Sequence, residues 1–434
     1  AAATTGFWAL GGVSLAESKS PNEKLNVAFI GVGGQGGGNL GRIAELGENV
    51  VALCDVDEKT LDKAAEKHSK AAKYADFREM LEKQKDIDAV VISTPDHMHA
   101  PAGLMAMKLK KHVYCEKPLT HTVYEARLMR KVAKETGVAT SMGNHGTAND
   151  GLRRAVELVQ AGVIGPVREV HVWTNRPIWA QGMPNRPKPE ATPKTLNWDL
   201  WLGVAKERPY GPGYHPFSWR GWWDFGTGAL GDMACHTANM AFMACKLGYP
   251  VSVEAQSEAI NPETFPNWST ITYQFPKRGD QPELKWVWYD GKKKNKDGKE
   301  QPNLPNNRLC HELRSNSGSG SLLIGDKGYL FSPNDYGADF VLGFKDDYAG
   351  FKGPEKSLPR SKGHHKDWIL ACKGGAPAMA NFDYAAFLTE VVVLGNVALR
   401  VGKKIDWDAE NMTATNCPDV AQYIKPEYRK GWDL

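Results

Sequence analysis

The sequence predicts an α/β fold with two domains: an N-terminal domain on a doubly wound parallel sheet, and a C-terminal α/β domain with an open, mainly antiparallel sheet. Three observations support this prediction. Apolar runs alternate with amphipathic segments over residues 25–144, which is typical of parallel strands covered by helices on both faces. Beyond residue 147 several alternating runs follow one another without helices between them, as antiparallel strands do. With 434 residues, the chain is also too long for one ordinary core.

The glycine-rich turn after the first apolar run is the most informative stretch. Gly31, Gly33 and Gly36 fit the pattern G-x-G-x-x-G between a predicted strand and a predicted helix, and Asp55 ends the next apolar run. The first glycine allows a tight turn, the second lets backbone amides approach a pyrophosphate, and the third lets helix and strand pack closely. Asp55 would bind the hydroxyls of an adenosine ribose and repel a 2′-phosphate, so the predicted cofactor is NAD rather than NADP. The cofactor residues predicted here are Gly31, Gly33, Gly34, Gln35, Gly36 and Asp55.

The composition is that of a globular protein and excludes several classes of partner. Hydrophobic residues make up 41% and charged residues 24% of the chain, and the formal net charge is +4. The basic residues are scattered, so neither nucleic acid nor a membrane surface is a predicted partner. The 14 tryptophans are a mild indication of a carbohydrate ligand, because their faces stack on sugar rings. The seven cysteines show no paired spacing and are expected to be buried free thiols.

Residues 1–24 are predicted to be the remnant of an export signal followed by a polar linker. The first 16 residues carry no charge and end in a small-x-Ala sequence at Ser14 and Ala16, like a cleavage site. They are too short and too rich in glycine to span a bilayer. An exported, periplasmic protein with a signal of the twin-arginine type is therefore expected, or a cytoplasmic one if this segment is retained. The alternative interpretation is an ordered arm that lies on a neighbouring subunit.

The predicted dinucleotide-binding domain spans residues 25–146, and the second domain spans residues 147–434. Residues 175–216 are rich in proline, tryptophan and glycine and form a long irregular segment of the kind usually kept for function. A last helix over residues 384–401 is apolar enough to pack against either domain. The other elements expected are helices over 147–161 and 229–247, and strands over 167–174, 251–258, 268–275, 284–290 and 321–332, the last with a hairpin turn at GDKG.

Two strand ends in the first domain carry unusual polar sequences. Ligands of open α/β sheets bind at the carboxyl ends of the strands. One strand ends in Thr94-Pro95-Asp96-His97-Met98-His99, and another ends in Glu116-Lys117-Pro118. Lys117 could donate a hydrogen bond to a substrate hydroxyl, and partial burial in a cationic or apolar surround would lower its pKa. The alternative is a surface lysine in a turn.

A third group of residues lies in the helix predicted from about residue 229. Asp232 and His236 are four residues apart, so they share one face of this helix. Oxidation of a secondary alcohol needs a base for the hydroxyl proton, and a neutral histidine oriented by a carboxylate can serve. The alternatives are a helix salt bridge and a metal site formed by Asp232, Cys235 and His236, or by His97 and His99. No metal is predicted, because neither spacing matches a common zinc pattern.

Together these motifs resemble the Gfo/Idh/MocA oxidoreductases, the family of inositol dehydrogenases and glucose-fructose oxidoreductase. The resemblance covers nearly the whole chain from Leu25. Two departures from the simplest members are a glycine-rich run that reads GTG rather than GGG, and Cys235 before the histidine. The motifs are, in order, G-x-G-x-x-G, T-P-x-x-x-H at residues 94–99, E-K-P at 116–118, W-R at 219–220, the glycine-rich run at 226–228 and D-x-x-x-H at 232–236.

The resemblance implies a Rossmann domain followed by an α/β domain whose open sheet commonly forms an oligomer interface. It implies that Lys117, Asp232 and His236 form the catalytic group, with His236 as proton acceptor and Lys117 polarising the reacting hydroxyl. Thr94 and Pro95 are assigned to the cofactor site, and His99, Glu116 and Asn144 would line its nicotinamide end. The predicted substrate wall consists of Trp179, Trp219, Arg220, Trp222 and Trp223, and this aromatic wall favours a glycoside over a free monosaccharide.

Three hypotheses follow for the function. The leading one is an NAD-dependent oxidoreductase that transfers hydride between the cofactor and a secondary hydroxyl of a sugar, polyol or glycoside. The second is a glycosidase that keeps NAD bound, oxidises the sugar transiently, eliminates the aglycone and returns the hydride. The third is a non-catalytic nucleotide- or sugar-binding protein, since fold does not fix function. The expected partners are a small carbohydrate and further copies of the chain, with no nucleic acid and no membrane span.

Overall fold

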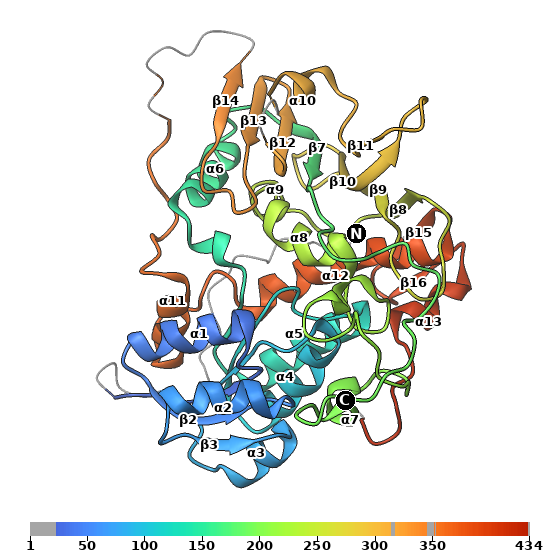
Figure 1. The fold of residues 1–434 in the computed structure, drawn as a ribbon. Helices are drawn as coiled ribbons and strands as arrows, with labels where there is room; N and C mark the ends of the chain where they lie inside the picture. Colours follow the sequence, from blue (N-terminus) through green and yellow to red (C-terminus); the bar gives the residue numbers. More distant parts are fainter. Residues whose placement is uncertain (1–22, 314–316, 345–350, 352, 433–434) are drawn as a thin grey trace.

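The computed structural model describes residues 23–313, 317–344, 351 and 353–432, and it contains two sheets with a long helix between them (Figure 1). The segment predicted to be an export signal lies outside the described residues. Figure 1 shows the first sheet and its helices in the lower half of the view and the second sheet in the upper half. The α/β class predicted from the sequence is confirmed.

The first sheet is parallel and has the strand order β3-β2-β1-β4-β5-β6, the order of a Rossmann fold. Its central strands β4 and β5 are buried along their whole length, because helices cover both faces. Its strands are β1 (Asn26–Ile30), β2 (Asn49–Cys54), β3 (Ala72–Tyr74), β4 (Ala89–Ile92), β5 (His112–Cys115) and β6 (Thr140–Met142). Its helices are α1 (Gly34–Glu45), α2 (Glu58–Lys67), α3 (Phe77–Lys83), α4 (His99–Lys108) and α5 (Val123–Thr136).

The glycine-rich turn joins β1 to α1 as predicted. Gly31 has φ of +80°, a conformation that favours glycine. A Cβ atom on Gly36 would overlap the carbonyl oxygen of Gly31, so this position admits only glycine. The first turn of α1 therefore packs directly on the end of β1.

The second sheet is open and mixed, with the order β14-β13-β12-β7-β10-β9-β8-β15-β16 and β11 paired to β10. All its neighbouring strands are antiparallel except β7 and β10, which are parallel. This confirms the mainly antiparallel sheet. Its strands are β7 (Val167–Trp173), β8 (Ser252–Ser257), β9 (Trp268–Phe275), β10 (Leu284–Lys294), β11 (Glu300–Pro302), β12 (Gly320–Gly325), β13 (Gly328–Ser332), β14 (Val341–Phe344), β15 (Ile405–Asp408) and β16 (Thr413–Ala414).

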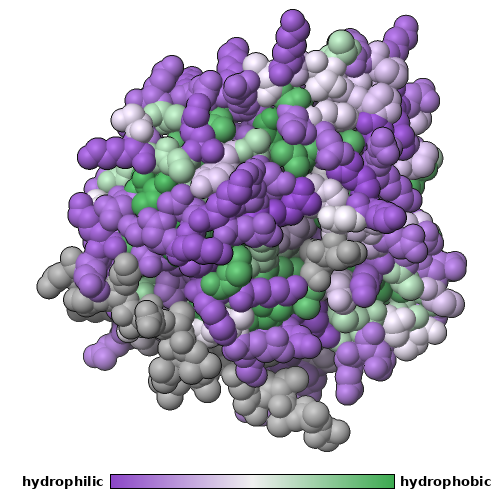
Figure 2. All heavy atoms as spheres, turned by 90° about the horizontal axis from the view of Figure 1, so that it is seen from below, coloured by the Kyte–Doolittle hydropathy of each residue, from purple (hydrophilic) through white to green (hydrophobic). Residues whose placement is uncertain are grey.

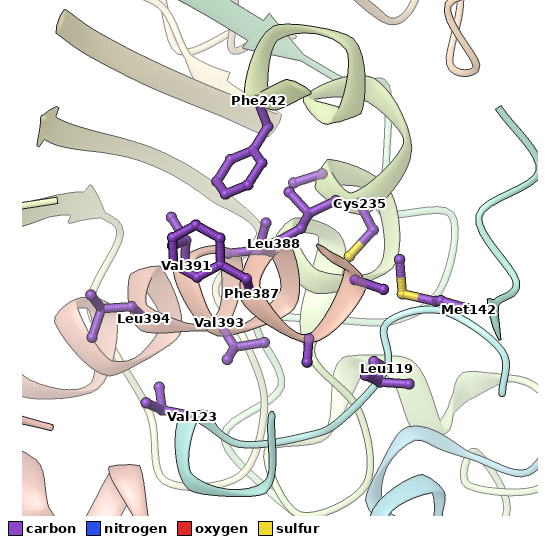
Figure 3. Close-up of a cluster of buried hydrophobic side chains, with 14 of the residues drawn as sticks. Leu119, Val123, Met142, Cys235, Phe242, Phe387, Leu388, Val391, Val393 and Leu394 are labelled. Atoms are coloured by element: carbon purple, nitrogen blue, oxygen red, sulfur yellow. The ribbon is translucent and has the colours of Figure 1, made fainter. Parts of the chain in front are cut away.

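Helix α12 (Phe382–Val401) connects the two domains. It contacts α5 of the first domain, and α8 (Gly228–Thr237) and β8 of the second. Figure 3 shows its apolar side chains, among them Phe387, Leu388 and Val391, in one cluster with residues of both domains. The helix is long and apolar enough to cross a membrane, but 83% of its apolar 18-residue stretch is buried inside the protein. Its apolarity is explained by this position between two domains.

Several elements differ from the sequence prediction. The helix predicted over residues 229–247 is divided into α8 and α9 (Asn239–Ala244), and the helix predicted over 147–161 is α6 (Asp150–Gln160) after a short 3-10 turn. Helix α11 (His364–Cys372) was not predicted and packs back on α1 and β6. The remaining helices without a prediction are α7 (Trp198–Leu202), α10 (Arg308–Leu313) and α13 (Ala421–Ile424).

The surface agrees with the composition. The face seen from below in Figure 2 is mostly hydrophilic, and apolar residues are exposed there in small separate groups. All seven cysteines are free and buried, as predicted.

Candidate active site

A cavity of about 780 Å³ lies between the two domains at the carboxyl ends of the parallel strands. Its lower wall comes from the loops after β1, β2, β4 and β5, and its upper wall comes from α8 and the segment between β7 and α8. The predicted site residues that line it are Gly31, Gly33, Gly34, Gln35, Asp55, Thr94, Pro95, Glu116, Lys117, Trp179, Trp219, Arg220, Asp232 and His236.

The glycine turn and Asp55 form one end of this cavity. The Asp55 carboxylate accepts hydrogen bonds from the backbone amides of Val32, at 2.9 Å, and Asp57, at 3.0 Å, which fix it beside the turn. Burial raises the pKa of Asp55, and these amides partly oppose the shift. The pyrophosphate of a dinucleotide fits the glycine turn, which carries no Cβ atoms, and the start of α1. The adenosine ribose fits the carboxylate at the end of β2.

Lys117 and Asp232 meet at the other end of the cavity. The Lys117 ammonium donates to the Asp232 carboxylate at 2.8 Å and to the Asp232 carbonyl at 3.0 Å. Arg220 donates to the same carboxylate oxygen at 3.2 Å. Burial opposes both charged forms, but the opposite charges outweigh it, so the pKa of Lys117 is raised and that of Asp232 is lowered. The predicted fall in the Lys117 pKa is therefore wrong, because the sequence did not show that Asp232 pairs with it.

His236 is oriented by Asn144 rather than by Asp232. Its Nδ1 lies 3.0 Å from the Asn144 side-chain oxygen, while the Asn144 side-chain nitrogen donates to the Cys235 carbonyl at 2.6 Å. Since an amide oxygen only accepts, Nδ1 of His236 carries the proton and Nε2 has the free lone pair. Burial, with the charge of Lys117, lowers the pKa of His236 well below its usual value. His236 is therefore a neutral base at the cavity wall, and the predicted orienting role of Asp232 is corrected.

Glu116 lies between the glycine turn and Lys117. Its carboxylate accepts from the side-chain amides of Asn39, at 2.8 Å, and Gln35, at 3.3 Å. A Cβ atom on Gly143 would overlap this carboxylate, so the glycine makes room for it at the cavity wall. Glu116 and Gln35 thus lie where the nicotinamide half of a dinucleotide would run.

Three residues assigned to the cofactor lie behind the cavity wall instead. The His99 ring is held between the carbonyls of Pro118, at 2.8 Å, and Thr94, at 2.9 Å, and is 1% exposed. Asn144 is fully buried behind His236, and Gly36 lies beneath Gly31. None of the three lines the cavity, which corrects the positions predicted for His99 and Asn144, whereas Gly36 has the close helix–strand packing expected of the third glycine.

The aromatic wall is smaller than predicted. Trp179, Trp219 and Arg220 line the cavity, and the Arg220 guanidinium lies 4.2 Å from the centre of the Trp219 ring. Trp222 is 1% exposed in an apolar cluster with Tyr214 and Phe225, so it does not reach the cavity. Trp223 lines a separate cavity of about 560 Å³, where Arg400 stacks on it. The assignment of Trp222 and Trp223 to the substrate is corrected.

The residues considered for a metal point in different directions. Figure 3 shows the Cys235 side chain in the apolar cluster beside α12. Asp232 and His236 line the cavity, and Cys235 does not. His97 is fully buried between the carbonyls of Trp201, at 3.1 Å, and Phe225, at 3.3 Å. Among the described residues no group of three or more histidine, cysteine or acidic side chains could hold a metal ion.

The structure adds residues that sequence reasoning missed. The Tyr336 ring, from the loop after β13, lies 4.8 Å from the His236 ring, edge to face. Arg176 and Ile178 also line the cavity and were not predicted, whereas Phe217 and buried Asp96, which line it too, lie in stretches that the sequence had already singled out. His145 lines it too, and this residue could have been found, because it directly follows the predicted strand that ends near residue 144. Tyr336 carried no local signal, since it is 100 positions from His236 in the sequence.

These features define the class of the protein. A Rossmann sheet with a dinucleotide cradle faces a lysine–carboxylate pair and a neutral histidine across one cavity, as in an NAD-binding oxidoreductase. The chain belongs to the Gfo/Idh/MocA oxidoreductase family. The family model described as an oxidoreductase family with an NAD-binding Rossmann fold matches residues 25–144, and the one described as its C-terminal alpha/beta domain matches residues 153–302.

Curated relatives match only part of this chain. A 2,7-anhydro-N-acetylneuraminate hydratase of Escherichia coli is 29% identical over 156 residues, which are 35% of this chain and 41% of that protein. An inositol 2-dehydrogenase of Salmonella paratyphi B is 28% identical over 186 residues, 41% of this chain and 54% of that protein. An alpha-N-acetylgalactosaminidase of Shewanella oneidensis is 36% identical over 124 residues, 26% of this chain and 27% of that protein. The matches thus span about half or less of each relative.

Solved structures share the fold over most of the chain. The WlbA dehydrogenase of Bordetella pertussis, solved in complex with NADH and UDP-GlcNAcA, has a TM-score of 0.63 and 16% sequence identity. The similarity covers 89% of this chain and 98% of that one.

Proposed function

We propose that this protein is an NAD-dependent oxidoreductase that transfers hydride between the nicotinamide and a secondary hydroxyl of a sugar, polyol or glycoside. The observation that carries the proposal is the meeting of Lys117, Asp232 and neutral His236 at the end of the cavity opposite the glycine turn. The inositol 2-dehydrogenase relative and the WlbA dehydrogenase complexes support a polyol or sugar substrate. The aromatic wall of Trp179 and Trp219 supports a carbohydrate as well.

The side chains divide the reaction between them. The Lys117 ammonium, kept charged by Asp232, donates a hydrogen bond to the reacting hydroxyl oxygen and stabilises the negative charge that develops there. Nε2 of His236 accepts the hydroxyl proton, because Nδ1 is already protonated and bound to Asn144. When bound, NAD supplies the hydride acceptor at the nicotinamide. His236, which takes the proton, belongs to α8 of the second domain, whereas Gln35 and Glu116, which would hold the nicotinamide end of the cofactor, belong to the first domain.

Product analysis with site variants tests this function. Purified protein with NAD is given a panel of sugars, polyols and aryl glycosides, and both reduced nicotinamide and keto products are measured. His236→Gln should lower kcat/KM by about 10²–10⁴ while NAD binding is kept, because the proton acceptor is lost. His311→Gln, at an exposed position far along the chain, is the matched control. If no substrate in the panel gives a keto product or labelled hydride transfer with the wild type, the proposal fails.

A glycosidase that uses the same residues is the second candidate. It is supported by the alpha-N-acetylgalactosaminidase relative, which is the most identical of the three relatives over its matched segment. Oxidation of the hydroxyl two carbons from the glycosidic carbon acidifies the proton on the carbon between them, so that loss of this proton expels the aglycone. Water then adds to the double bond, and the hydride returns to the carbonyl carbon. Release of nitrophenol from a nitrophenyl glycoside without net NADH would favour this candidate over a net dehydrogenase.

Location and assembly are further parts of the proposal. We infer an exported protein from the uncharged first 16 residues and their small-x-Ala ending. We also infer a homo-oligomer formed through the second sheet, because this sheet is open and not closed into a barrel. Cell fractionation and light scattering of the purified protein test these two inferences.

A further inference from the structure

The cavity of about 560 Å³ that Trp223 lines is separate from the candidate active site. Its volume is within the range of small-molecule sites, and no residue lines both cavities. Its walls come mainly from the loop after β5, the segment between α7 and α8, the second half of α12 and the chain from α13 to Tyr428. Figure 1 shows α13 beside α12, and the two helices are in contact. The C-terminal segment thus closes this cavity against α12.

The start of α8 lies between the two cavities. Asn396, which lines the cavity beside α12, donates to the Thr227 carbonyl at 2.9 Å. The Thr227 hydroxyl donates to the carboxylate of Asp96, which lines the candidate active site, at 2.7 Å. The cavities are therefore neighbours across Thr227, and an experiment on one of them has to exclude binding in the other.

Much of the wall beside α12 is apolar and deeply buried. Side chains of the loop after β5, of the segment after α7 and of α12 form this part of the wall. A ligand that reaches them gains most if its body is apolar, because the contact removes apolar surface from water. These side chains, each at most 4% exposed, are Val123, Val204, Phe265, Val393 and Val397.

Arg400, in the last turn of α12, brings a positive charge to this cavity. Its guanidinium lies 4.5 Å from the centre of the Trp223 ring and 4.6 Å from the centre of the Tyr423 ring. Contacts with two aromatic rings hold the planar guanidinium in place. Burial lowers the pKa of Arg400, but a guanidinium stays protonated in proteins. The cavity therefore has a fixed cation on its wall.

This cation lacks an acidic partner of its own. Within the part of the chain that the structure describes, no carboxylate forms an ion pair with Arg400. The charge of Asp224 acts on Arg400, but the Asp224 carboxylate pairs with Arg208. The hydroxyl of Tyr423 is a hydrogen-bond partner without charge. Because a partly buried guanidinium usually binds an oxyanion, the N–H groups of Arg400 point to an anionic ligand.

The surrounding charges favour a carboxylate over a phosphate. Lys206 and Lys425 line the cavity and are exposed, and so is the acidic Glu427, while Asp224 lies beside Arg400. A guanidinium binds the two oxygens of a carboxylate with parallel N–H groups. The two acids would repel a doubly charged phosphate more strongly than a singly charged carboxylate.

We propose that this cavity is a second ligand site, which binds a small organic carboxylate with its charged group on Arg400 and its apolar body against Val393, Val397 and Phe265. The site differs from the candidate active site in its residues and in its chemistry, since it contains neither the glycine turn nor Lys117.

Calorimetric titration of the full chain tests the ligand chemistry. The probe is 3-phenylpropanoate, and its control is 3-phenylpropan-1-ol, which has the same body without the charge. We expect saturable binding of the acid and about ten-fold weaker binding of the alcohol, because a charge-assisted hydrogen bond is lost. Absence of binding by the acid, equal affinities for acid and alcohol, or displacement of the acid by an equal concentration of inorganic phosphate would overturn the proposal.

Variants of Arg400 test the residue that holds the charge. Arg400→Gln should weaken binding of the acid about ten-fold. Arg400→Lys, which keeps the charge without the planar N–H groups, should weaken it less. Lys403→Gln removes a charge at an exposed position that does not line the cavity, so it is the matched control. Urea unfolding shows that each variant is folded, and it gives a second readout, since a ligand of the folded chain raises the free energy of unfolding.

A variant of the candidate active site shows which cavity the acid occupies. Arg220→Gln removes a guanidinium from that site and leaves Arg400 in place. We expect this variant to bind the acid with wild-type affinity. Weaker binding in Arg220→Gln together with unchanged binding in Arg400→Gln would place the acid in the active-site cavity and overturn the proposal.

Discussion

Two hydrogen-bonded pairs serve the proposed proton transfer, and each pair sets the charge of one group. Asp232 keeps Lys117 positive, while Asn144 fixes the neutral tautomer of His236. An anion beside His236 would instead raise the pKa of its imidazole. More of the imidazole would then be protonated near neutral pH and unable to accept a proton from the substrate. Both pairs join residues of the two domains, so the site exists only when the domains are assembled.

Replacing Asp232 should show what the carboxylate does. In Asp232→Asn, Lys117 keeps its burial and the nearby Arg220 but loses its anionic partner, so its pKa falls. Because the reaction needs the charged amine, the alkaline limb of the kcat/KM profile should move to lower pH by about 1 unit or more. Asp232→Glu, which keeps the charge, should leave the limb near its wild-type position. An unmoved limb in the asparagine variant would show that Lys117 does not titrate in the profile.

Replacing Asn144 should move the opposite limb. In Asn144→Asp, a carboxylate accepts from Nδ1 of His236 and raises the pKa of the imidazole. The neutral base is then lost at a higher pH, so the acid limb of kcat/KM should move to higher pH by about 1 unit. Asn144→Ala lacks the charge and should lower kcat with little movement of this limb. Identical acid limbs in the aspartate variant and the wild type would contradict the role given to His236.

At the scale of elements, α12 is the helix on which both domains pack. Its polar residues are few because it is buried between α5 on one side and α8 and β8 on the other. Gly395 lies where the helix passes the Tyr273 hydroxyl of β9, which donates to the Val392 carbonyl at 2.9 Å. A methyl group at this glycine would overlap the hydroxyl oxygen and the Leu230 side chain. The helix therefore approaches the second sheet more closely than alanine would allow.

The Gly395→Ala variant should lower the free energy of unfolding by about 1–3 kcal/mol, because overpacking forces the helix away from β9. The same change in a Tyr273→Phe background should cost less, since the overlapping hydroxyl is gone. Urea unfolding of the four proteins of this double-mutant cycle measures the difference. Equal costs in the two backgrounds would place the strain elsewhere.

At the scale of the whole molecule, buried neutral histidines make stability depend on pH. Burial lowers the pKa of His97 and His365 to about 3 and that of His112 to about 4. The unfolded chain binds protons at these histidines below about pH 6.5, whereas the folded chain does not until the pH is far lower. Their contribution is therefore complete above pH 6.5 and is lost as the pH falls. Asp290, whose pKa burial raises to about 6, acts in the opposite direction.

We therefore expect the folded protein to lose stability between pH 6 and pH 5. Each of the three histidines contributes about 1 kcal/mol per pH unit, and Asp290 offsets about one of them, so these four groups by themselves give a loss of about 2 kcal/mol. Urea unfolding at several pH values measures this slope. His112→Gln should reduce it, because glutamine can still accept the bond from the Ala139 amide but does not titrate. A slope of opposite sign would mean that buried acids outweigh the histidines.

The sequence by itself determined the features that depend on local pattern. Local sequence pattern was enough to predict the glycine turn with Asp55, and Lys117 at the end of a strand. It was also enough to place Asp232 and His236 on one face of a helix, because they are four residues apart. The strand runs over residues 268–275 and 284–290 were likewise predictable from alternation, and both are strands in the structure.

Only the tertiary structure decided which of these side chains meet. Asp232 pairs with Lys117 across 115 positions of the chain, Asn144 reaches His236 across 92, and Tyr336 arrives from the loop after β13. The position of α7 depends in the same way on contacts with the loops after β2 and β4 and with Arg429 near the C-terminus. Pairings of this kind are selected by the packing of whole domains, and a single sequence carries no local pattern that records them.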